Sequence, residues 1–207
     1  MLLGHSEATQ ATTNTDAVDI QTMNQRLFSF AGGNAGPWRI DSITAVMGAP
    51  VPVTSHLSVM PGDATPQGAS WVLRGVTSNE RYVMREEKKQ LVNRQPILGR
   101  TEATHAALIP IRKTQAWWAL SQDDRRQIFE EQSAHIKVGM KYLPEVARRL
   151  HHCRDLGRPE PFDFLTWFEF APEHSAAFDA LLAELRASPE WLFVEREIDI
   201  RLQRVAA

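Results

Sequence analysis

The sequence predicts an α+β fold in which helices lie outside a single antiparallel sheet or barrel. The second half of the 207-residue chain carries hydrophobic patterns in the order strand, helix, strand, strand, helix, strand. That order is typical of a ferredoxin-like unit. The first half carries three strand patterns and then one helix pattern, which we interpret as an eroded copy of the same unit. Two such units side by side would merge their strands into one sheet.

The first half contains the weaker patterns, and its elements are predicted from short stretches. We expect strands near residues 27–31, 38–47 and 69–77. A helix is expected at about residues 79–92. No sequence identity between the two halves is visible, so the repeat is inferred from the order of elements alone.

In the second half, residues 105–111 form a short β-rich stretch. Ser121 is a suitable N-cap for the helix that follows, because Asp123 and Asp124 would then lie in its first turn. One face of this expected helix carries residues at helical spacing: Ile128, Phe129, Gln132, His135 and Ile136. Pro144 cannot continue a helix, so the helix is expected to end before it.

A strand is expected at residues 145–153, followed by the rest of the predicted unit. Alternation divides this strand into two sides, with Val146, Arg148, Leu150 and His152 on one and Ala147, Arg149 and His151 on the other. After a turn, residues 162–171 carry aromatic side chains on both faces, as expected for a central buried strand. A helix with an apolar stripe follows Pro172, and residues 191–202 alternate as a last strand.

Composition argues against several classes of function. The formal net charge of −2 provides no basic surface for nucleic acid or an anionic membrane. No apolar run approaches the ~20 residues that cross a bilayer. The single cysteine, Cys153, cannot form an intramolecular disulfide, which suits a reducing compartment.

The predicted domain organisation has three parts. Residues 1–25 lack a basic segment followed by an apolar one, so we interpret them as a flexible leader rather than a secretion signal. Residues 26–104 form an N-terminal ferredoxin-like half, and residues 105–207 form the C-terminal half that carries the chemistry. A cytoplasmic location is favoured, and a periplasmic one stays open in case a signal peptide has been removed.

Common catalytic motifs are missing from the sequence. There is no glycine-rich phosphate loop and no GxSxG, HExxH or CxxCH motif. The run His151-His152-Cys153 resembles a metal site, but neighbours on a strand face opposite ways, so both histidines cannot bind one ion without distortion. We expect instead a half-buried strand with one inner histidine and a small apolar cysteine.

His135 is the stronger candidate for chemistry. A lone histidine on an apolar helical face is usually a core residue, but Arg148 is expected on the inward face of the next strand. A guanidinium is costly to bury without a partner, so Arg148 either pairs with a carboxylate or receives an anion. Lys113 and the pair Trp117-Trp118 precede the helix, and Glu190 precedes the last strand, from where it could reach back toward the helix.

Three segments resemble the chlorite dismutase family. They are KTQAWW at 113–118, HIKVGMKYLPEVARRLHHCRDLG at 135–157, and FDFLTWFEFAPEHSAAFDALLAELRASPEWLFVEREIDIRL at 162–202. In lacking a long N-terminal extension, the sequence resembles the short-chain lineage of this family, whose members are dimeric. The resemblance therefore implies a homodimer with haem b as cofactor and chlorite as a small anionic substrate.

The resemblance also implies residue roles on the proximal side of the haem. His135 matches the proximal iron ligand, and Glu190 matches the carboxylate that hydrogen-bonds it. Lys113 matches the lysine of the same network. Trp117 and Trp118 match the tryptophan pair beside and below the haem. A carboxylate on the second imidazole nitrogen gives the ligand imidazolate character and makes it a stronger donor to ferric iron.

On the distal side, Arg148 matches the arginine of chlorite-degrading members, and Gln95 is similar to a glutamine of the short lineage. The family converts chlorite into chloride and dioxygen. After an O–Cl bond breaks, a hypochlorite-level fragment must stay close to the iron, and a positioned guanidinium suits that task. Arg148 would then act as a gatekeeper rather than as an acid or base.

Several alternatives remain open. Coprohaem decarboxylation shares the fold and the proximal histidine, but such members typically lack an arginine at the position of Arg148. A haem peroxidase is a related option. A non-catalytic haem-binding or haem-sensing protein belongs to a different class. A cofactor-free ferredoxin-like monooxygenase would leave His135 unexplained.

Overall fold

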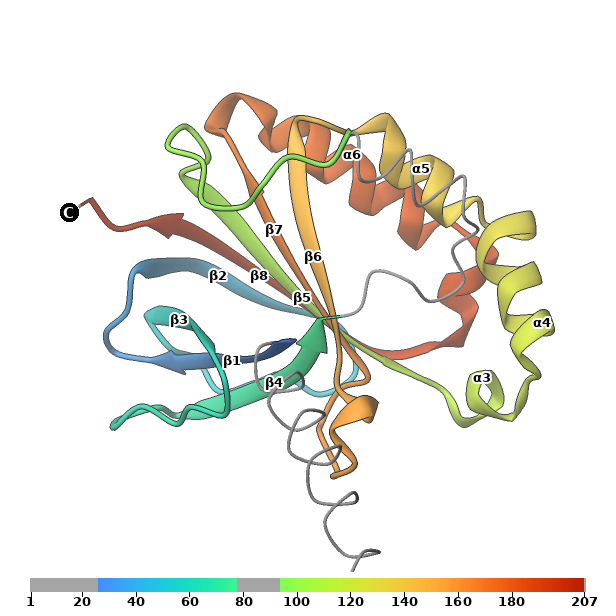
Figure 1. The fold of residues 1–207 in the computed structure, drawn as a ribbon, viewed down its shortest axis with the longest axis horizontal. Helices are drawn as coiled ribbons and strands as arrows, with labels where there is room; N and C mark the ends of the chain where they lie inside the picture. Colours follow the sequence, from blue (N-terminus) through green and yellow to red (C-terminus); the bar gives the residue numbers. More distant parts are fainter. Residues whose placement is uncertain (1–25, 78–93, 207) are drawn as a thin grey trace, which may run out of the picture.

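Eight strands form a closed barrel in the computed structural model, which describes residues 26–77 and 94–206 (Figure 1). Their order around the barrel is β1-β3-β2-β8-β5-β7-β6-β4, and every pair of neighbours is antiparallel. The strands are β1 (Leu27–Gly33), β2 (Trp38–Met47), β3 (His56–Pro61), β4 (Trp71–Thr77), β5 (His105–Lys113), β6 (Val146–His152), β7 (Phe164–Phe170) and β8 (Val194–Arg204). The predicted antiparallel barrel is confirmed.

Helices lie outside the barrel, on the side of the C-terminal strands (Figure 1). The helical elements are α3 (Gln115–Ala119), α4 (Gln122–Arg126), η1 (Gln127–Gln132), α5 (His135–Lys141), η2 (Arg154–Leu156), η3 (Pro172–His174), α6 (Ser175–Arg186) and η4 (Pro189–Phe193). Together with β5, β6, β7 and β8 they give the predicted order of a ferredoxin-like unit. No helix within the described ranges is long and apolar enough to cross a membrane.

In the first half, the three predicted strands correspond to β1, β2 and β4, and β3 is an additional strand that the sequence did not indicate. β3 is short, contains Ser58 and ends at Pro61, so its hydrophobic alternation is weak. It forms because β1 and β2 both offer backbone partners to it. The predicted helix at 79–92 and the predicted leader at 1–25 lie outside the described residues.

The prediction of one continuous helix after Ser121 is wrong, although its start is correct. Ser121 caps α4, with its Oγ accepting from the backbone N of Asp124 at 3.1 Å. The chain then passes through the π-helical turn η1, and Ala134 adopts the left-handed region with φ of 49°. A left-handed residue cannot continue a right-handed helix, so α5 begins anew at His135.

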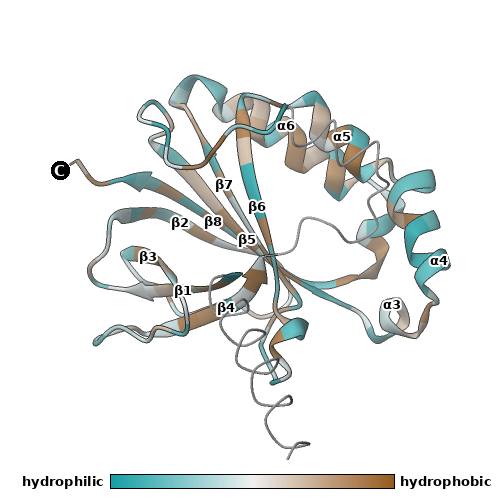
Figure 2. Ribbon diagram, in the orientation of Figure 1, coloured by the Kyte–Doolittle hydropathy of each residue, from teal (hydrophilic) through white to brown (hydrophobic). Residues whose placement is uncertain are grey.

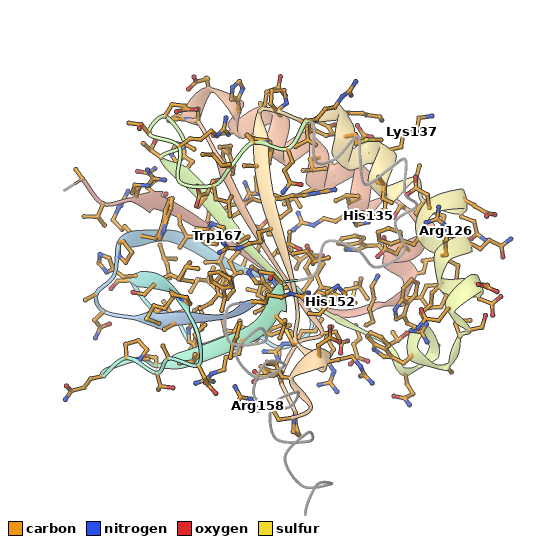
Figure 3. The ribbon with its side chains drawn as sticks, in the orientation of Figure 1. Arg126, His135, Lys137, His152, Arg158 and Trp167 are labelled. Atoms are coloured by element: carbon orange, nitrogen blue, oxygen red, sulfur yellow. The ribbon has the colours of Figure 1, made fainter. Side chains whose placement is uncertain are left out.

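Two apolar cores lie on opposite faces of the sheet. The barrel interior includes Phe30, Leu57 and Trp167, and Figure 3 places Trp167 within the barrel. The second core lies between the sheet and α6 and includes Phe168 and Phe178. Figure 2 shows hydrophobic segments along the strands and a hydrophilic α4 at the periphery.

Both faces of β6 are therefore covered. The predicted alternation is confirmed, with Val146 in the core under the helices and His151 among aromatic rings of the barrel interior. His152 faces the opposite way, and its ring lies 4.9 Å from that of Phe164. Only one inner histidine was expected, but His151 and His152 are both buried because β6 is covered on both sides.

His151 is held as a neutral side chain. Its ring lies 5.3 Å from that of Phe28 and 5.0 Å from that of Phe30. Its Nδ1 lies 3.1 Å from the carbonyl oxygen of Leu165, while its Nε2 accepts from Nε of Arg149 at 3.1 Å. These contacts require a proton on Nδ1 alone. Burial, together with the nearby charge of Arg149, lowers the pKa of His151 from 6.5 to about 3.

Candidate active site

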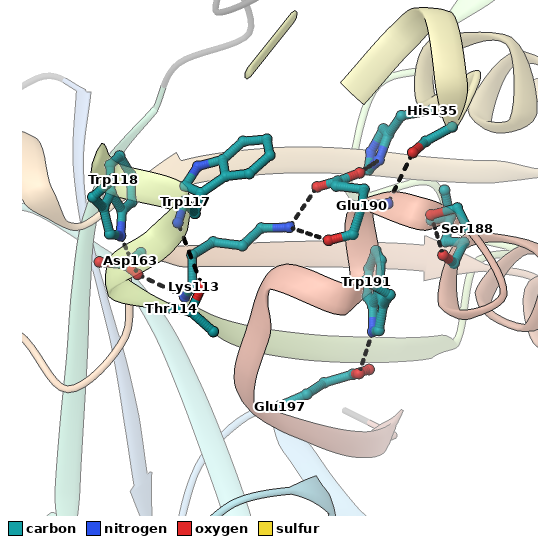
Figure 4. A network of polar contacts seen from close by, with 12 residues as sticks. Lys113, Thr114, Trp117, Trp118, His135, Asp163, Ser188, Glu190, Trp191 and Glu197 are labelled. Atoms are coloured by element: carbon teal, nitrogen blue, oxygen red, sulfur yellow. Dashed lines mark hydrogen bonds and ion pairs between the residues drawn. The ribbon is translucent and has the colours of Figure 1, made fainter. Parts of the chain in front are cut away.

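The predicted proximal residues come together at one buried carboxylate (Figure 4). Oε2 of Glu190 lies 2.7 Å from Nδ1 of His135, and Oε1 of Glu190 accepts from Nζ of Lys113 at 2.7 Å. Glu190 and Lys113 are each only 4% exposed. The three residues come from α5, η4 and the end of β5, so the fold assembles a triad from distant parts of the sequence.

Electrostatics fix the protonation of this triad. Burial alone would raise the pKa of Glu190, but interaction with His135 and Lys113 outweighs burial and lowers the pKa to about 2. An ionised carboxylate only accepts hydrogen bonds, so the proton of the His135 contact must be on Nδ1. In the neutral imidazole with its proton on Nδ1, the other ring nitrogen, Nε2, carries the lone pair and is the atom available for coordination.

The break in the helix determines the position of His135. Because Ala134 interrupts the backbone ladder, the backbone N of Ile136 donates to the side chain of Glu130 at 2.9 Å instead of to a carbonyl. The ring of Phe129 stacks on that of His135, with a centroid separation of 4.3 Å and an interplanar angle of 22°. In Figure 3, His135 lies on the side of α5 that faces the barrel, whereas Lys137 points away.

A second hydrogen bond connects the helix break before His135 to Glu190. Oγ of Ser133, which is buried, accepts from the backbone N of Glu190 at 2.9 Å. The residue before the left-handed Ala134 is thus fixed to the turn that carries the partner of His135. Sequence reasoning did not identify Ser133, because nothing in its local pattern distinguishes it from other serines in a helix.

Aromatic rings surround the lysine of the triad. Nζ of Lys113 lies 4.7 Å from the ring centre of Trp117 and 5.5 Å from that of Trp191. Trp117 is buried, in agreement with the prediction that it packs at this site. Trp191 was not predicted, although it follows Glu190 directly in the sequence.

Trp118 lies one step from the triad. Its Nε1 donates to Oδ2 of Asp163 at 3.2 Å, and the same oxygen accepts from the backbone N of Lys113 at 2.8 Å. The guanidinium of Arg154 stacks on Trp118, with Cζ 4.1 Å from the ring centre. Asp163 thus links Trp118 to the strand end that carries Lys113, and sequence reasoning missed this buried aspartate.

The predicted distal residues meet at β6, which carries Arg148 and which Gln95 contacts. Gly139 of α5 lies against the guanidinium of Arg148, since a Cβ at Gly139 would be 2.9 Å from Cζ of Arg148 and closer still to Nη1. Gly139 follows His135 by one helical turn, ~5.4 Å along the helix, so the histidine and the guanidinium share one face of α5. The side-chain amide of Gln95 donates to the backbone carbonyl of Arg148 rather than to its guanidinium.

Arg148 is half-buried on β6 and largely shielded from bulk water. This desolvation lowers the pKa of its guanidinium, yet the group stays charged at physiological pH. Within residues 26–77 and 94–206, its guanidinium forms no ion pair with a carboxylate. A half-buried, desolvated cation without a carboxylate partner among these residues is suited to bind an anion.

The donor set fits haem rather than a bare metal ion. Among the described residues, no three His, Cys, Asp or Glu side chains are grouped to hold a metal. A haem iron already has four porphyrin nitrogens and needs one protein ligand. His135 offers Nε2 for this purpose, with its other nitrogen fixed by a carboxylate as in typical metal-ligating histidines. The described residues therefore fit this cofactor.

A family comparison identifies the chain. The model of the family described as chlorite dismutase matches residues 62–204, well over half of the sequence. The chain belongs to the chlorite dismutase family. This confirms the resemblance seen in the sequence, and the match includes every residue proposed above for the proximal and distal groups.

Individual chlorite dismutases support the same assignment. The crystal structure of a dimeric chlorite dismutase from Nitrobacter winogradskyi is 54% identical, covers 86% of this chain and 99% of that chain, and has a TM-score of 0.79. The chlorite dismutase from Candidatus Nitrospira defluvii in complex with imidazole is 18% identical, covers 92% and 95%, and has a TM-score of 0.62, which supports the fold alone.

A curated chlorite dismutase from Ideonella dechloratans is 29% identical over 122 residues. The match covers 57% of this chain but only 39% of that protein. The chain thus spans about two fifths of the length of this relative.

Proposed function

We propose that this protein is a haem b enzyme that converts chlorite into chloride and dioxygen. The observation that supports this most strongly is the His135–Glu190 pair, which directs Nδ1 to the carboxylate and leaves Nε2 as the coordinating atom. The guanidinium of Arg148 lies against Gly139, one turn along α5 on the same face as His135. The kinship with chlorite dismutases, including one that is dimeric, supports the reaction and a homodimeric assembly.

On the proximal side, His135 is the proposed iron ligand. When bound, haem supplies an open coordination position at which chlorite binds and its oxygen atoms can be joined. Glu190 orients the imidazole, holds its Nδ1 proton and increases the donor strength of Nε2. Lys113 donates a hydrogen bond to the same carboxylate of Glu190. It therefore limits how far the Nδ1 proton of His135 moves toward Glu190. Trp117 and Trp191 exclude water from this ion pair.

On the distal side, Arg148 is the proposed anion-holding residue. Chlorite carries one negative charge, and a guanidinium shielded from bulk water attracts it more strongly than one in water would. After the O–Cl bond breaks, the same cation retains the hypochlorite-level fragment until the O–O bond forms. Gln95 fixes the backbone of β6 at this residue and thereby supports its position.

An oxygen electrode tests the proposal. We expect the haem-supplied protein to show a Soret band and to evolve one dioxygen for each chlorite consumed. His135→Ala should lose the five-coordinate haem spectrum, and Arg148→Ala should release hypochlorite and inactivate sooner. A protein that binds haem through His135 but evolves no oxygen would point to a sensor, a peroxidase or a coprohaem decarboxylase, and the proposal would be wrong.

A further inference from the structure

A second buried carboxylate lies behind the proximal triad. Glu197 on β8 is 0% exposed, and both of its oxygens are occupied. Oε1 accepts from Nε and Nη2 of Arg186 at 2.8 and 2.6 Å, and Oε2 accepts from Nε1 of Trp191 at 2.8 Å. A charge this deep is tolerated only with full compensation, which Arg186 supplies.

Trp191 connects this carboxylate to the triad (Figure 4). It follows Glu190 directly within the short helical turn η4, so the orientation of its indole restricts the backbone from which the Glu190 side chain extends. Its ring also forms one wall around Nζ of Lys113. The Trp191–Glu197 hydrogen bond therefore fixes η4 against β8, and the Ser133 contact fixes the backbone N of Glu190 in the same turn.

We propose that Glu197, held by Arg186, is a positioning residue for the proximal site. It acts through Trp191 by keeping the carboxylate of Glu190 at hydrogen-bonding distance from Nδ1 of His135. This inference rests on the proposed function in one respect, namely that His135 is the iron ligand. If the proposal holds, the donor strength of the His135 imidazole depends on Glu197, which does not contact the imidazole and acts through Trp191 and Glu190.

The neighbouring Asp199 provides a matched control. It lies two residues further along β8, is also buried, and accepts from the same Nη2 of Arg186 at 3.1 Å. The indole N–H of Trp191 donates to Glu197 and not to Asp199, which is instead paired with Arg201. Asp199→Asn thus removes a buried negative charge beside Arg186 while leaving the Trp191 hydrogen bond in place.

Two variants break the proposed link in different ways. The two oxygens of Glu197 face different donors, and Glu197→Gln turns one of them into an NH2 group. The variant therefore keeps an acceptor toward either Arg186 or Trp191 but not toward both. Trp191→Phe keeps an aromatic ring and removes the N–H donor. Each should lower the iron–histidine stretching frequency of the ferrous haem protein in resonance Raman spectra. Each should also raise the iron reduction potential by about 59 mV, equal to a tenfold change for one electron.

Combining the variants tests whether they act through one bond. The double variant Glu197→Gln, Trp191→Phe should shift the frequency no further than either single change, and Asp199→Asn should leave it at the wild-type value. A wild-type frequency and potential in both single variants would overturn the proposal. An equal shift in Asp199→Asn would also overturn it, because the effect would then be general electrostatics.

A measurement without cofactor separates this inference from the proposed function. In the haem-free protein, the Nδ1 proton of His135 should give a low-field resonance, since it is shared with a carboxylate. Glu197→Gln should shift that resonance or abolish it, and Asp199→Asn should not. If chlorite is not converted but these shifts occur, only the proposed function fails. If oxygen is evolved but the shifts are missing, only the positioning role fails.

Discussion

Gly139→Ala offers a sharp test of the distal site, because function should respond much more strongly than stability. Alanine is favoured over glycine in a helix interior by about 1 kcal/mol. In this protein the added methyl would lie 2.9 Å from Cζ of Arg148, which is too close for carbon atoms. The clash involves the end of a flexible side chain, so the guanidinium can move at a cost of about 1–3 kcal/mol. The free energy of unfolding should therefore fall by about 2 kcal/mol at most.

The functional effect of Gly139→Ala should be larger. A displaced guanidinium no longer faces the same side as His135, so hypochlorite should escape and the number of chlorite molecules converted before inactivation should fall toward the value for Arg148→Ala. The assay is an oxygen electrode with a hypochlorite trap, run beside urea unfolding. Lys137→Ala, at an exposed position on the same helix, is the control. Wild-type turnover capacity in Gly139→Ala, with no hypochlorite trapped, would refute the placement of Arg148.

Three further changes follow from the buried polar groups. Ser133→Ala leaves the backbone N of Glu190 without its acceptor and should cost about 1–3 kcal/mol in urea unfolding; an unchanged midpoint would contradict this. Lys113→Met removes the ammonium group that pairs with buried Glu190, and we expect a loss of about 3 kcal/mol, with a conserved midpoint as the opposing result. His151 has a lower pKa in the folded chain, about 3, than the ordinary 6.5, so the unfolded chain binds the proton first as pH falls. Stability from this residue is complete above pH 6.5 and should decline by about 1.4 kcal/mol per pH unit below it, whereas His151→Gln should show a shallower slope.

The sequence predicted the C-terminal half of the fold well because its signals are local. The N-cap at Ser121 and the alternation along β6 depend on neighbouring residues, and both were confirmed. The strand β3 was missed because its pairing with β1 and β2 compensates for a weak pattern. The break before His135 was also missed, because a left-handed alanine has no compositional signature of the kind that glycine provides.

The candidate site was predicted in a different way. Resemblance to a family, rather than spacing, suggested that Lys113, His135 and Glu190 belong together, and the structure brings them within hydrogen-bonding distance. Glu197 and Gly139 were not foreseen, since each acts through a contact with a residue distant in the fold. Periodicity reports which side of an element faces inward, but it does not report which residue on another element is met there.

The stacking of Phe129 on His135 has a consequence for assembly. Between that ring and the carboxylate of Glu190, the imidazole cannot rotate freely about its own axis, even in the chain alone. The rotational entropy of the imidazole side chain is lost during folding, so it is not lost again when a ligand binds to Nε2. The plane of the imidazole is thus defined in advance, and any flat macrocycle that docks must accept that orientation. Substituting Phe129 should broaden the spread of ligand orientations without removing the coordinating nitrogen.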